Sequence, residues 1–387
     1  MTTIEVRHVS LDAPDGRRLL DDVSLSVPSG SQLAVCGPHG AGKSALMRVI
    51  VGIDDHTDGD VVIDGVVVNA VGPRQRDVAM VFSDFALHPH LDVYDNLAFA
   101  ARLRRGTDDD AIDDRVEEVA EFLALSHLLE LKPDELDDSQ KQRVAIGRSL
   151  VRDALGYLFD EPFTAQDDRV RAHVRSVTTR WQAERQRTSI FTTSDVHEAL
   201  TLADRIAVMH QGYVHQVGSP REIYDQPADL FVAGFLGVPA MNLVPARLSG
   251  QQLVMPLASI PVDEALRQRL GDREMVLVGI RPEQCHDATT SAGREVRERV
   301  EFTTRIDDVE WRGKTQLVYL GYELDPSVEE TLTELEDSLD FDLFQNFVVA
   351  ELPASSELRS GMTARIVVSR DAIHIFDAQT GENLTRG

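Results

Sequence analysis

The sequence predicts an α/β domain of the phosphate-loop type, followed by a smaller domain built mainly of β-strands. Three observations lead to this prediction. A glycine-rich loop containing a lysine follows a short apolar run and precedes a helical one. Strand-like and helical segments then alternate as far as Phe235, which is typical of a mainly parallel sheet. Beyond Phe235, β-type runs separated by turn residues take over. A chain of 387 residues has room for two or three domains.

The N-terminal part is expected to begin with short antiparallel strands. Residues 1–30 alternate around the turn Pro14-Asp15-Gly16, and Asp64-Gly65 separates two valine-rich runs as in a hairpin. The expected elements are strands over Gln32–Cys36, Val61–Ile63, Val66–Val68 and Val78–Phe82, and a helix over Ala45–Val51.

Helices and buried strands are expected to follow. Apolar residues recur at helical spacing from Asp109 to about Leu131, and a second helix is expected from about Gln140 to Arg152. Three short runs read as strands with helices between them, which indicates one mainly parallel sheet. These runs are Gly156–Phe159, Ser189–Thr192 and Arg205–Met209.

The chain changes character at a linker-like segment, Gly237-Val238-Pro239-Ala240, which predicts domains over residues 1–237 and 238–387. The second domain is expected to be a small barrel or sandwich, interrupted by an acidic, partly helical excursion from Glu323 to Asp342. Its strands are expected over Leu243–Pro245, Met275–Ile280, Leu317–Leu320, Phe347–Leu352, Ala364–Val368 and Ala372–Phe376.

Charge and cysteine content limit the function classes. The formal net charge is −26, which argues against nucleic acid as a partner and disfavours adhesion to an anionic membrane surface. Two cysteines cannot form a disulfide framework or a cysteine-rich zinc site, which fits a reducing compartment. No signal peptide or membrane-spanning run is visible, so a cytoplasmic protein is expected.

The glycine-rich loop matches the pattern G-x-x-x-x-G-K-[ST] without a gap. Its glycines let successive N–H groups point inward as an anion nest, and the following helix N-terminus adds a favourable dipole. Lys43 is expected to reach the β- and γ-phosphates of ATP, and the Ser44 hydroxyl to ligate Mg²⁺. His39 is expected to face solvent rather than to take part in catalysis. The predicted nucleotide-binding residues are Gly37, Pro38, His39, Gly40, Ala41, Gly42, Lys43, Ser44 and Ala45.

Two carboxylates end the apolar strand Gly156–Phe159. Asp160 is expected to hold the Mg²⁺ shell together with Ser44, and Glu161 to act as the general base that activates the attacking water. Two acids at a strand end are common, but a phosphate loop in the same chain favours the catalytic interpretation.

These motifs, together with five further segments, make the chain similar to the ATP-binding subunits of ABC importers, and within them to the sugar and glycerol-phosphate branch. The matching segments are Val81–Leu91 (Q-loop region), Gln142–Arg148 (helix after the signature), Asp195–Ala199 (after the switch histidine), Phe231–Gly237 (end of the ATPase domain) and Val278–Glu283 (regulatory domain). The resemblance implies an ABC-type P-loop ATPase domain with an N-terminal antiparallel β subdomain and a helical subdomain. It also implies a C-terminal all-β regulatory domain of OB-like barrels.

The chain departs from the family pattern at four motifs and at the adenine-stacking position. In the resemblance, Ala13 stands for the aromatic residue that stacks on adenine, Ser83 for the Q-loop glutamine and Ser194 for the switch histidine. The family's signature L-S-G-G-Q reads Leu136-Asp137-Asp138-Ser139-Gln140, which places two carboxylates where the family binds the γ-phosphate held by the opposite subunit. Of the D-loop, only Asp167 matches.

The resemblance implies an ATP-hydrolysing subunit of an importer for a carbohydrate or polyol phosphate, and the altered motifs predict weakened hydrolysis. Such a subunit would work at the cytoplasmic face of the membrane, as a homodimer or with a paralogous ATPase, with permease subunits and an extracytoplasmic solute-binding protein. Two alternatives stay open at this point. One is a catalytically deficient regulatory or structural subunit that binds ATP and pairs with an active paralogue. The other is a family member that has lost transport altogether.

Overall fold

The computed structural model describes residues 2–103, 108–162, 187–290, 295–296, 298–339 and 343–386. The chain forms two compact units, Met1–Pro220 and Arg221–Gly387. The first contains the predicted phosphate loop. The compact units divide after Pro220, whereas the sequence predicted a domain boundary after Gly237. The predicted boundary stays a prediction.

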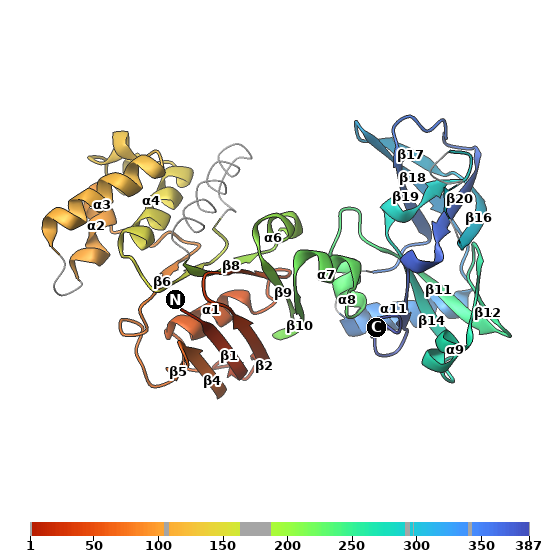
Figure 1. Cartoon of the computed structure of the whole chain (residues 1–387), viewed down its shortest axis with the longest axis horizontal. Helices are drawn as coiled ribbons and strands as arrows, with labels where there is room; N and C mark the ends of the chain where they lie inside the picture. Colours follow the sequence, from red (N-terminus) through yellow and green to blue (C-terminus); the bar gives the residue numbers. More distant parts are fainter. Residues whose placement is uncertain are drawn as a thin grey trace. The chain divides into compact units, whose positions relative to one another are not determined.

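The first unit contains an antiparallel sheet and a mainly parallel one (Figure 1). The antiparallel sheet has the order β2-β1-β4-β5, and its first hairpin closes where Ala13 N donates to Arg17 O at 2.8 Å, at the predicted turn. Its strands are β1 (Ile4–Asp12), β2 (Arg18–Val27), β4 (Asp58–Ile63) and β5 (Val66–Val67).

The second sheet of this unit has the order β10-β9-β3-β8-β7-β6, and only the β9–β10 pair is antiparallel. Because β8 lies between β3 and β7, the loops that leave these three strands meet at one edge of the sheet. The strands are β3 (Gln32–Cys36), β6 (Val78–Val81), β7 (Gly156–Phe159), β8 (Thr188–Thr193), β9 (Arg205–His210) and β10 (Tyr213–Gly218).

Helix α1 (Lys43–Val51) begins inside the phosphate loop and buries Leu46, Met47 and Ile50 in the core of this unit. Helices α2, α3 and α4 pack against one another as a separate helical group (Figure 1). The bounds of the remaining helices are α2 (Val93–Arg102), α3 (Asp109–Phe122), η1 (Ser126–Leu128), η2 (Pro133–Glu135), α4 (Asp138–Val151) and α6 (Val196–Leu202).

One predicted helix is shorter than its apolar pattern suggested. The periodicity predicted a helix from Asp109 to about Leu131, but α3 ends at Phe122. Ala124 has φ 52°, in the left-handed region, and a helix cannot continue through that conformation. The apolar residues beyond it, including Leu125 and Leu128, are still buried, so their spacing reflected burial and not one continuous helix.

The second unit is built mainly of antiparallel strands, as predicted. Its sheets have the orders β13-β12-β11-β14-β21, β15-β20-β16 and β17-β18-β19. The strands are β11 (Asn242–Ser249), β12 (Gln252–Val254), β13 (Ser259–Pro261), β14 (Met275–Ile280), β15 (His286–Asp287), β16 (Arg299–Arg305), β17 (Asp308–Trp311), β18 (Thr315–Gly321), β19 (Phe347–Pro353), β20 (Thr363–Ser369) and β21 (Ile373–Asp377).

Helices also belong to this unit. The acidic excursion forms α11, whose Val328, Leu332 and Leu335 are buried in a core with β11, β14 and β21 residues. Helix α8 is held by Arg281, which is 3% exposed and donates to Ala233 O and Leu236 O. The helices are α7 (Pro220–Asp225), α8 (Leu230–Phe235), α9 (Glu264–Leu270), η3 (Pro282–Gln284), α11 (Pro326–Leu339) and η4 (Arg370–Ala372).

Candidate nucleotide-binding site

The phosphate loop connects β3 to α1 and requires glycine at several positions. Gly40 and Gly42 have φ 82° and 100°, which residues with a side chain rarely adopt. At Gly37, a Cβ atom would lie 2.0 Å from the backbone oxygen of Met209. The loop therefore keeps its backbone close to β9, and it leads directly into the N-terminus of α1, which favours an anion.

Lys43 is the first residue of α1, and its side chain folds back over the loop. It is only 4% exposed, and Nζ donates to the backbone oxygens of Gly37 and Pro38 at 2.8 Å each. The same Nζ lies 3.5 Å from Oε1 of Glu161. The ammonium group thus lies between the phosphate loop and the end of β7, where it can meet a phosphate.

Asp160, directly after β7, joins the loop to the sheet. Its buried Oδ1 accepts hydrogen bonds from Ser44 Oγ at 3.0 Å and from Thr192 Oγ1 at 2.7 Å. A hydroxyl and a carboxylate oxygen side by side next to a phosphate loop are donors that suit Mg²⁺, which is held by few protein oxygens plus phosphate and water. The residues present therefore fit this ion, although no group of three or more His, Cys, Asp or Glu residues is gathered in the described parts of the chain.

Glu161 is held at both its backbone and its side chain. Its φ of 46° turns the residue out of the strand, and its N–H donates to Thr192 Oγ1 at 2.8 Å. Its Oε1 faces two groups of the phosphate loop, Lys43 Nζ at 3.5 Å and His39 Nδ1 at 3.9 Å. A carboxylate beside the phosphate loop is compatible with the predicted role of general base for an attacking water, and that role stays a prediction.

Thr192 was not predicted as a site residue. Its hydroxyl is the link between Asp160 and Glu161, because it donates to the first side chain and accepts from the backbone of the second. The sequence signal was weak: a threonine near the end of a buried strand is common in any sheet. Only the pairing of β7 with β8 places it beside the carboxylates.

Comparisons with known proteins bear on these observations. The family model described as ABC transporter matches residues 20–164, and the one described as MalK OB fold domain matches residues 237–285. The trehalose import ATP-binding protein SugC of Mycobacterium tuberculosis is 36% identical over 392 residues, covering 100% of this chain and 99% of that protein. The chain belongs to the ATP-binding proteins of ABC transporters.

A further relative and a solved structure also place this chain among the ABC transport ATPases. The sn-glycerol-3-phosphate import ATP-binding protein UgpC of Psychromonas ingrahamii is 35% identical over 385 residues, covering 99% of this chain and 96% of that protein. Among solved structures, a dimeric post-hydrolysis state of the ATP-binding cassette MJ0796 bound to ADP and Pi matches with a TM-score of 0.53 and 26% identity. That match covers 56% of this chain and 99% of the other. The predicted family and fold class are thereby confirmed.

The signature segment of this ABC ATPase starts helix α4 and caps it with its own carboxylate. Asp137 Oδ1 accepts from the backbone N–H of Gln140 at 2.7 Å, and the Gln140 side chain accepts from the backbone N–H of Asp137 at 2.9 Å. Asp138 pairs with Lys141 Nζ at 3.3 Å. Both aspartates are exposed, so the N-terminal end of α4 presents negative charge to its surroundings.

The other altered positions lie on separate elements. Ala13 is at the first hairpin turn, Ser83 is exposed in the turn after β6, and Ser194 directly follows β8. The D-loop residue Asp167 lies outside the described residues. The catalytic and binding roles assigned to these positions stay predictions.

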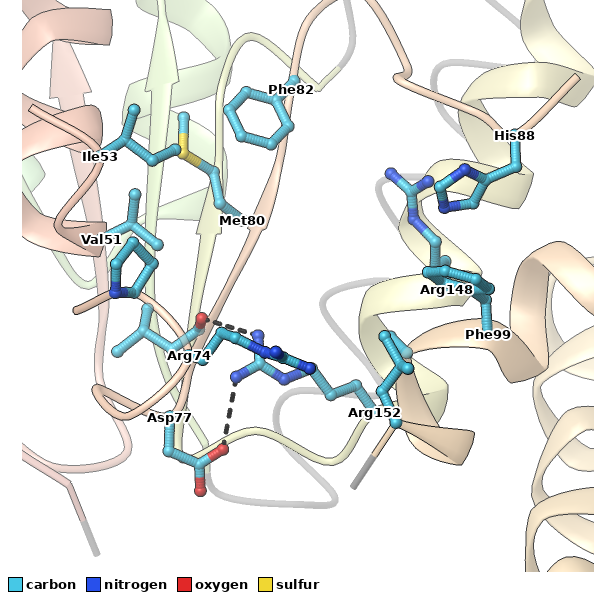
Figure 2. Close-up of a pocket in the computed structure, with 14 residues that line it drawn as sticks. Val51, Ile53, Arg74, Asp77, Met80, Phe82, His88, Phe99, Arg148 and Arg152 are labelled. Atoms are coloured by element: carbon cyan, nitrogen blue, oxygen red, sulfur yellow. Dashed lines mark hydrogen bonds and ion pairs between the residues drawn. The ribbon is translucent and has the colours of Figure 1, made fainter. Parts of the chain in front are cut away.

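A pocket of about 400 Å³ opens within the first unit, between the end of β6 and the helical group (Figure 2). One wall carries apolar side chains such as Val51, Ile53 and Met80, and the opposite wall carries His88, Phe99 and Arg148 (Figure 2). Arg74 adds positive charge to the lining, whereas Arg152 is paired with Asp77, which also lines the pocket, at 3.6 Å (Figure 2). Burial lowers the pKa of the Arg148 guanidinium, which donates to the backbone oxygens of Phe85 and Ala86 at 3.2 and 2.6 Å.

Among the described residues, no helix is both long and apolar enough to cross a membrane.

Proposed function

We propose that this chain is the ATP-binding subunit of an importer for a carbohydrate or polyol phosphate, with low ATP turnover of its own. The solute class follows from the names of the relatives, which import trehalose and sn-glycerol-3-phosphate. One observation carries the proposal of low turnover: a complete phosphate-loop site occurs in the same chain as a signature helix that is capped by Asp137.

Different residues of the phosphate-loop site would bind the phosphates, hold Mg²⁺ and position the carboxylates, and together they support ATP binding. Lys43 would exchange the loop carbonyls for the β- and γ-phosphates, because a phosphate is the stronger partner for an ammonium group. Ser44 and Asp160 would hold Mg²⁺, which supplies charge neutralisation to the phosphates when bound. Thr192 would keep Asp160 and Glu161 in place through its two hydrogen bonds.

Hydrolysis would use Glu161 as the general base. The water oxygen attacks the γ-phosphorus and gives a proton to the Glu161 carboxylate, while the bond from the γ-phosphorus to the bridging oxygen breaks and ADP leaves. General base catalysis of this kind contributes about 10²–10⁴-fold to a rate.

The signature explains why turnover would be low. In the family, this helix N-terminus contacts the γ-phosphate held by the opposite subunit, but here its donor at Gln140 is already used by Asp137. A phosphate charge about 4 Å from a carboxylate is repelled by about 1 kcal/mol in water and about 4 kcal/mol at an effective dielectric of about 20. Since both aspartates are exposed, the repulsion of the phosphate by each of them is closer to about 1 kcal/mol, and the two repulsions add.

The partners follow from the same family. A second copy or a paralogous ATPase would complete the site, and an extracytoplasmic binding protein would deliver the solute. Permease subunits would hold the chain at the cytoplasmic face of the membrane. The pocket of Figure 2 supports a permease contact near Phe82, because an apolar wall facing Arg148 suits a helix end that carries an acidic residue.

The second candidate is a regulatory subunit that binds ATP without turnover and pairs with an active paralogue. The altered residues beside the phosphate-loop site favour this candidate: the partner's signature would face the nucleotide held here, but Ser83 and Ser194 stand for the Q-loop glutamine and the switch histidine. In that case, the phosphate-loop site of this chain would act as a nucleotide sensor.

The experiment measures ATP binding and steady-state hydrolysis of the purified full chain. We expect tight Mg-ATP binding with slow turnover, and turnover typical of active importers would overturn the proposal. The combined variant Asp137→Ser, Asp138→Gly, Ser139→Gly, Ser83→Gln and Ser194→His restores the family residues and should raise hydrolysis. If hydrolysis stays unchanged in this variant, the altered motifs are not the limiting defect.

A further inference from the structure

The turn that follows β6 has an unusual backbone. Phe85 and Ala86 are consecutive residues with φ 62° and 45°, in the left-handed region that residues with a side chain rarely adopt. Phe85 N donates to Phe82 O at 3.2 Å. Ala86 N donates to Asp84 O at 2.8 Å, which closes the turn. A backbone of this kind persists where surrounding groups hold it, so the contacts of the turn indicate what it depends on.

Arg148 of α4 holds this turn from outside. Its guanidinium donates to Phe85 O at 3.2 Å and to Ala86 O at 2.6 Å, so one side chain binds the carbonyl groups of both left-handed residues. A guanidinium presents its donors as a rigid planar fork, which a lysine ammonium group does not reproduce. Arg148 therefore fixes the turn to α4 at two points.

Asn96 of α2 holds the other end of the same segment. This residue is fully buried, and its side-chain oxygen accepts from His88 N at 2.9 Å. Its side-chain nitrogen lies 3.1 Å from the backbone oxygens of both His88 and Leu91. The ring of His88 also packs against Phe99 of α2, with the ring centroids 4.2 Å apart. The segment Phe85–Leu91 is thus attached to the helical group at both ends.

Helix α4 is packed closely against its neighbours where Arg148 leaves it. At Gly147, a Cβ atom would lie 2.6 Å from Leu97 Cδ2 and 3.1 Å from Leu123 Cδ1, which belong to α2 and to the end of α3. The same helix begins at Asp138, beside the capped signature, and Arg148 lies about 15 Å further along it at 1.5 Å per residue. One helix therefore joins the signature segment to the turn.

The turn and its attachments shape one wall of the pocket in Figure 2. His88, Phe99 and Arg148 lie on this wall and face the apolar side chains of the opposite one (Figure 2). The Arg148 guanidinium thus lines the pocket and at the same time holds the backbone beside it. Losing its two hydrogen bonds would release the turn and change the shape of the pocket.

We propose that Arg148 is a positioning residue for permease docking, because it fixes the turn at one wall of this pocket to the helix that starts at the signature. This inference rests on the proposed function, which places a permease contact at the pocket. A docking surface that already has its bound shape avoids the cost of ordering it on association. Arg148 is therefore expected to act on the affinity for the permease and not on ATP binding.

The first test follows the turn in the full chain alone. Amide hydrogen exchange at Phe85 and Ala86 should be about tenfold to a hundredfold faster in Arg148→Met, because hydrogen bonds from a charged donor are lost. Arg148→Lys keeps the charge without the planar fork and should give an intermediate rate. Unchanged exchange in Arg148→Met overturns the proposal.

Arg143 provides a matched control on the same helix. Its guanidinium donates to Leu123 O at 3.0 Å and to Ala124 O at 3.2 Å, and Ala124 is itself left-handed with φ 52°. Arg143→Met should therefore accelerate exchange after α3, at the Leu125 amide, and leave the Phe85–Ala86 turn unchanged. Faster exchange at that turn in Arg143→Met as well would mean a general loosening of the helical group, and this overturns the proposal.

The second test measures docking. The full chain is titrated onto its cognate permease subunits in detergent micelles. Arg148→Met should weaken the association about tenfold or more, because the turn must then be ordered on binding. Arg148→Lys should recover part of the affinity, and Arg143→Met should leave it unchanged. Unchanged association in Arg148→Met, or equal weakening in Arg143→Met, overturns the proposal.

Mg-ATP affinity serves as the folding control and should stay unchanged in all three variants. If Arg148→Met loses Mg-ATP binding because it fails to fold, Arg148→Lys decides, and full association of Arg148→Lys then overturns the proposal.

The docking test separates this inference from the proposed function. If the unmodified chain does not associate with the permease, the permease contact of the proposed function fails, and the docking role of Arg148 fails with it. If the unmodified chain and Arg148→Met associate equally well, only the inference about Arg148 fails.

Discussion

The carboxylate of Asp137 and the backbone N–H of Gln140 are 2.7 Å apart, and the Gln140 side chain returns a hydrogen bond to Asp137 N at 2.9 Å. This reciprocal pair is a capping box, which satisfies two donors that a helix start otherwise leaves open. Asp137 therefore stabilises the start of α4 while it adds negative charge to the segment that, in the family, meets a phosphate. Under the proposed function, helix stability and binding of the opposite subunit's ATP make opposite demands on this one residue.

The capping role predicts a measurable stability difference between two adjacent aspartates. Asp137→Ala should lower the free energy of unfolding by about 1 kcal/mol, because an N-cap is lost. Asp138→Ala should change it by less than about 0.5 kcal/mol, because the carboxylate of Asp138 is 71% exposed and makes only a surface pair with Lys141. Urea denaturation compares the two, and hydrogen exchange at the Gln140 amide should accelerate only in Asp137→Ala. Equal effects of both variants would contradict the capping role.

Backbone conformation at the phosphate loop predicts a second contrast, between two glycines with positive φ. A Cβ atom at Gly42 would lie 2.7 Å from Leu19 O, whereas at Gly65 nothing lies within 4 Å. Gly65→Ala should cost only the conformational strain, about 1 kcal/mol, while Gly42→Ala adds a backbone clash and should cost about 2–3 kcal/mol. Thermal unfolding of the two variants measures this difference. ATP binding should survive in Gly65→Ala and be lost in Gly42→Ala, and binding by both would show that the loop tolerates the clash.

Titration of His374 predicts how stability depends on pH. Burial, and then the charge of Arg281, lower the pKa of His374 to about 4. The unfolded chain binds this proton near pH 6.5, whereas the folded chain binds it only near pH 4. Neutral His374 therefore leaves the free energy of unfolding undiminished above pH 6.5, and this free energy falls as the pH is lowered from 6.5 toward 4, because the unfolded chain binds the proton first. The urea midpoint of the unit containing β21 should therefore decline over that window. His374→Gln should flatten the decline, with His127→Gln as the control, and an unchanged slope would show that His374 is not responsible.

Much of the fold could be predicted because the signals are local. The phosphate loop, the strands on either side of it and the turn at Asp15-Gly16 each depend on residues close together in sequence. The start of α4 is equally local, since Asp137 and Gln140 have the spacing of a capping box. Strands such as β12 and β17 were missed because they are short, carry mixed polar residues and depend on pairing with longer neighbours.

Contacts between distant segments could not be predicted in the same way. Thr192 meets Asp160 only because β8 pairs with β7, and His39 meets Glu161 only because β3 and β7 end at the same edge of the sheet. Similarly, Arg281 was seen as part of a family motif, but its hold on α8 depends on the tertiary packing of the second unit. The order of the strands in the sheet determines the first two contacts, and this order cannot be predicted from any one segment of the sequence.

Nucleotide binding itself should depend on Lys43 and not on the altered motifs. Lys43 is one of four lysines in the chain, and its Nζ reaches both the phosphate loop and Glu161. Hydrogen bonds from a charged group are worth about 1.5–3 kcal/mol, so Lys43→Met should weaken Mg-ATP binding about tenfold to a hundredfold. Methionine keeps the length of the buried side chain, which limits damage to the fold. The control is Lys132→Met at an exposed lysine, which should leave affinity unchanged. Binding is followed by fluorescence of a labelled ATP, without any need for turnover. Equal affinity in Lys43→Met and the unmodified chain would mean that ATP is not held by this loop, and the proposed function would have to be abandoned.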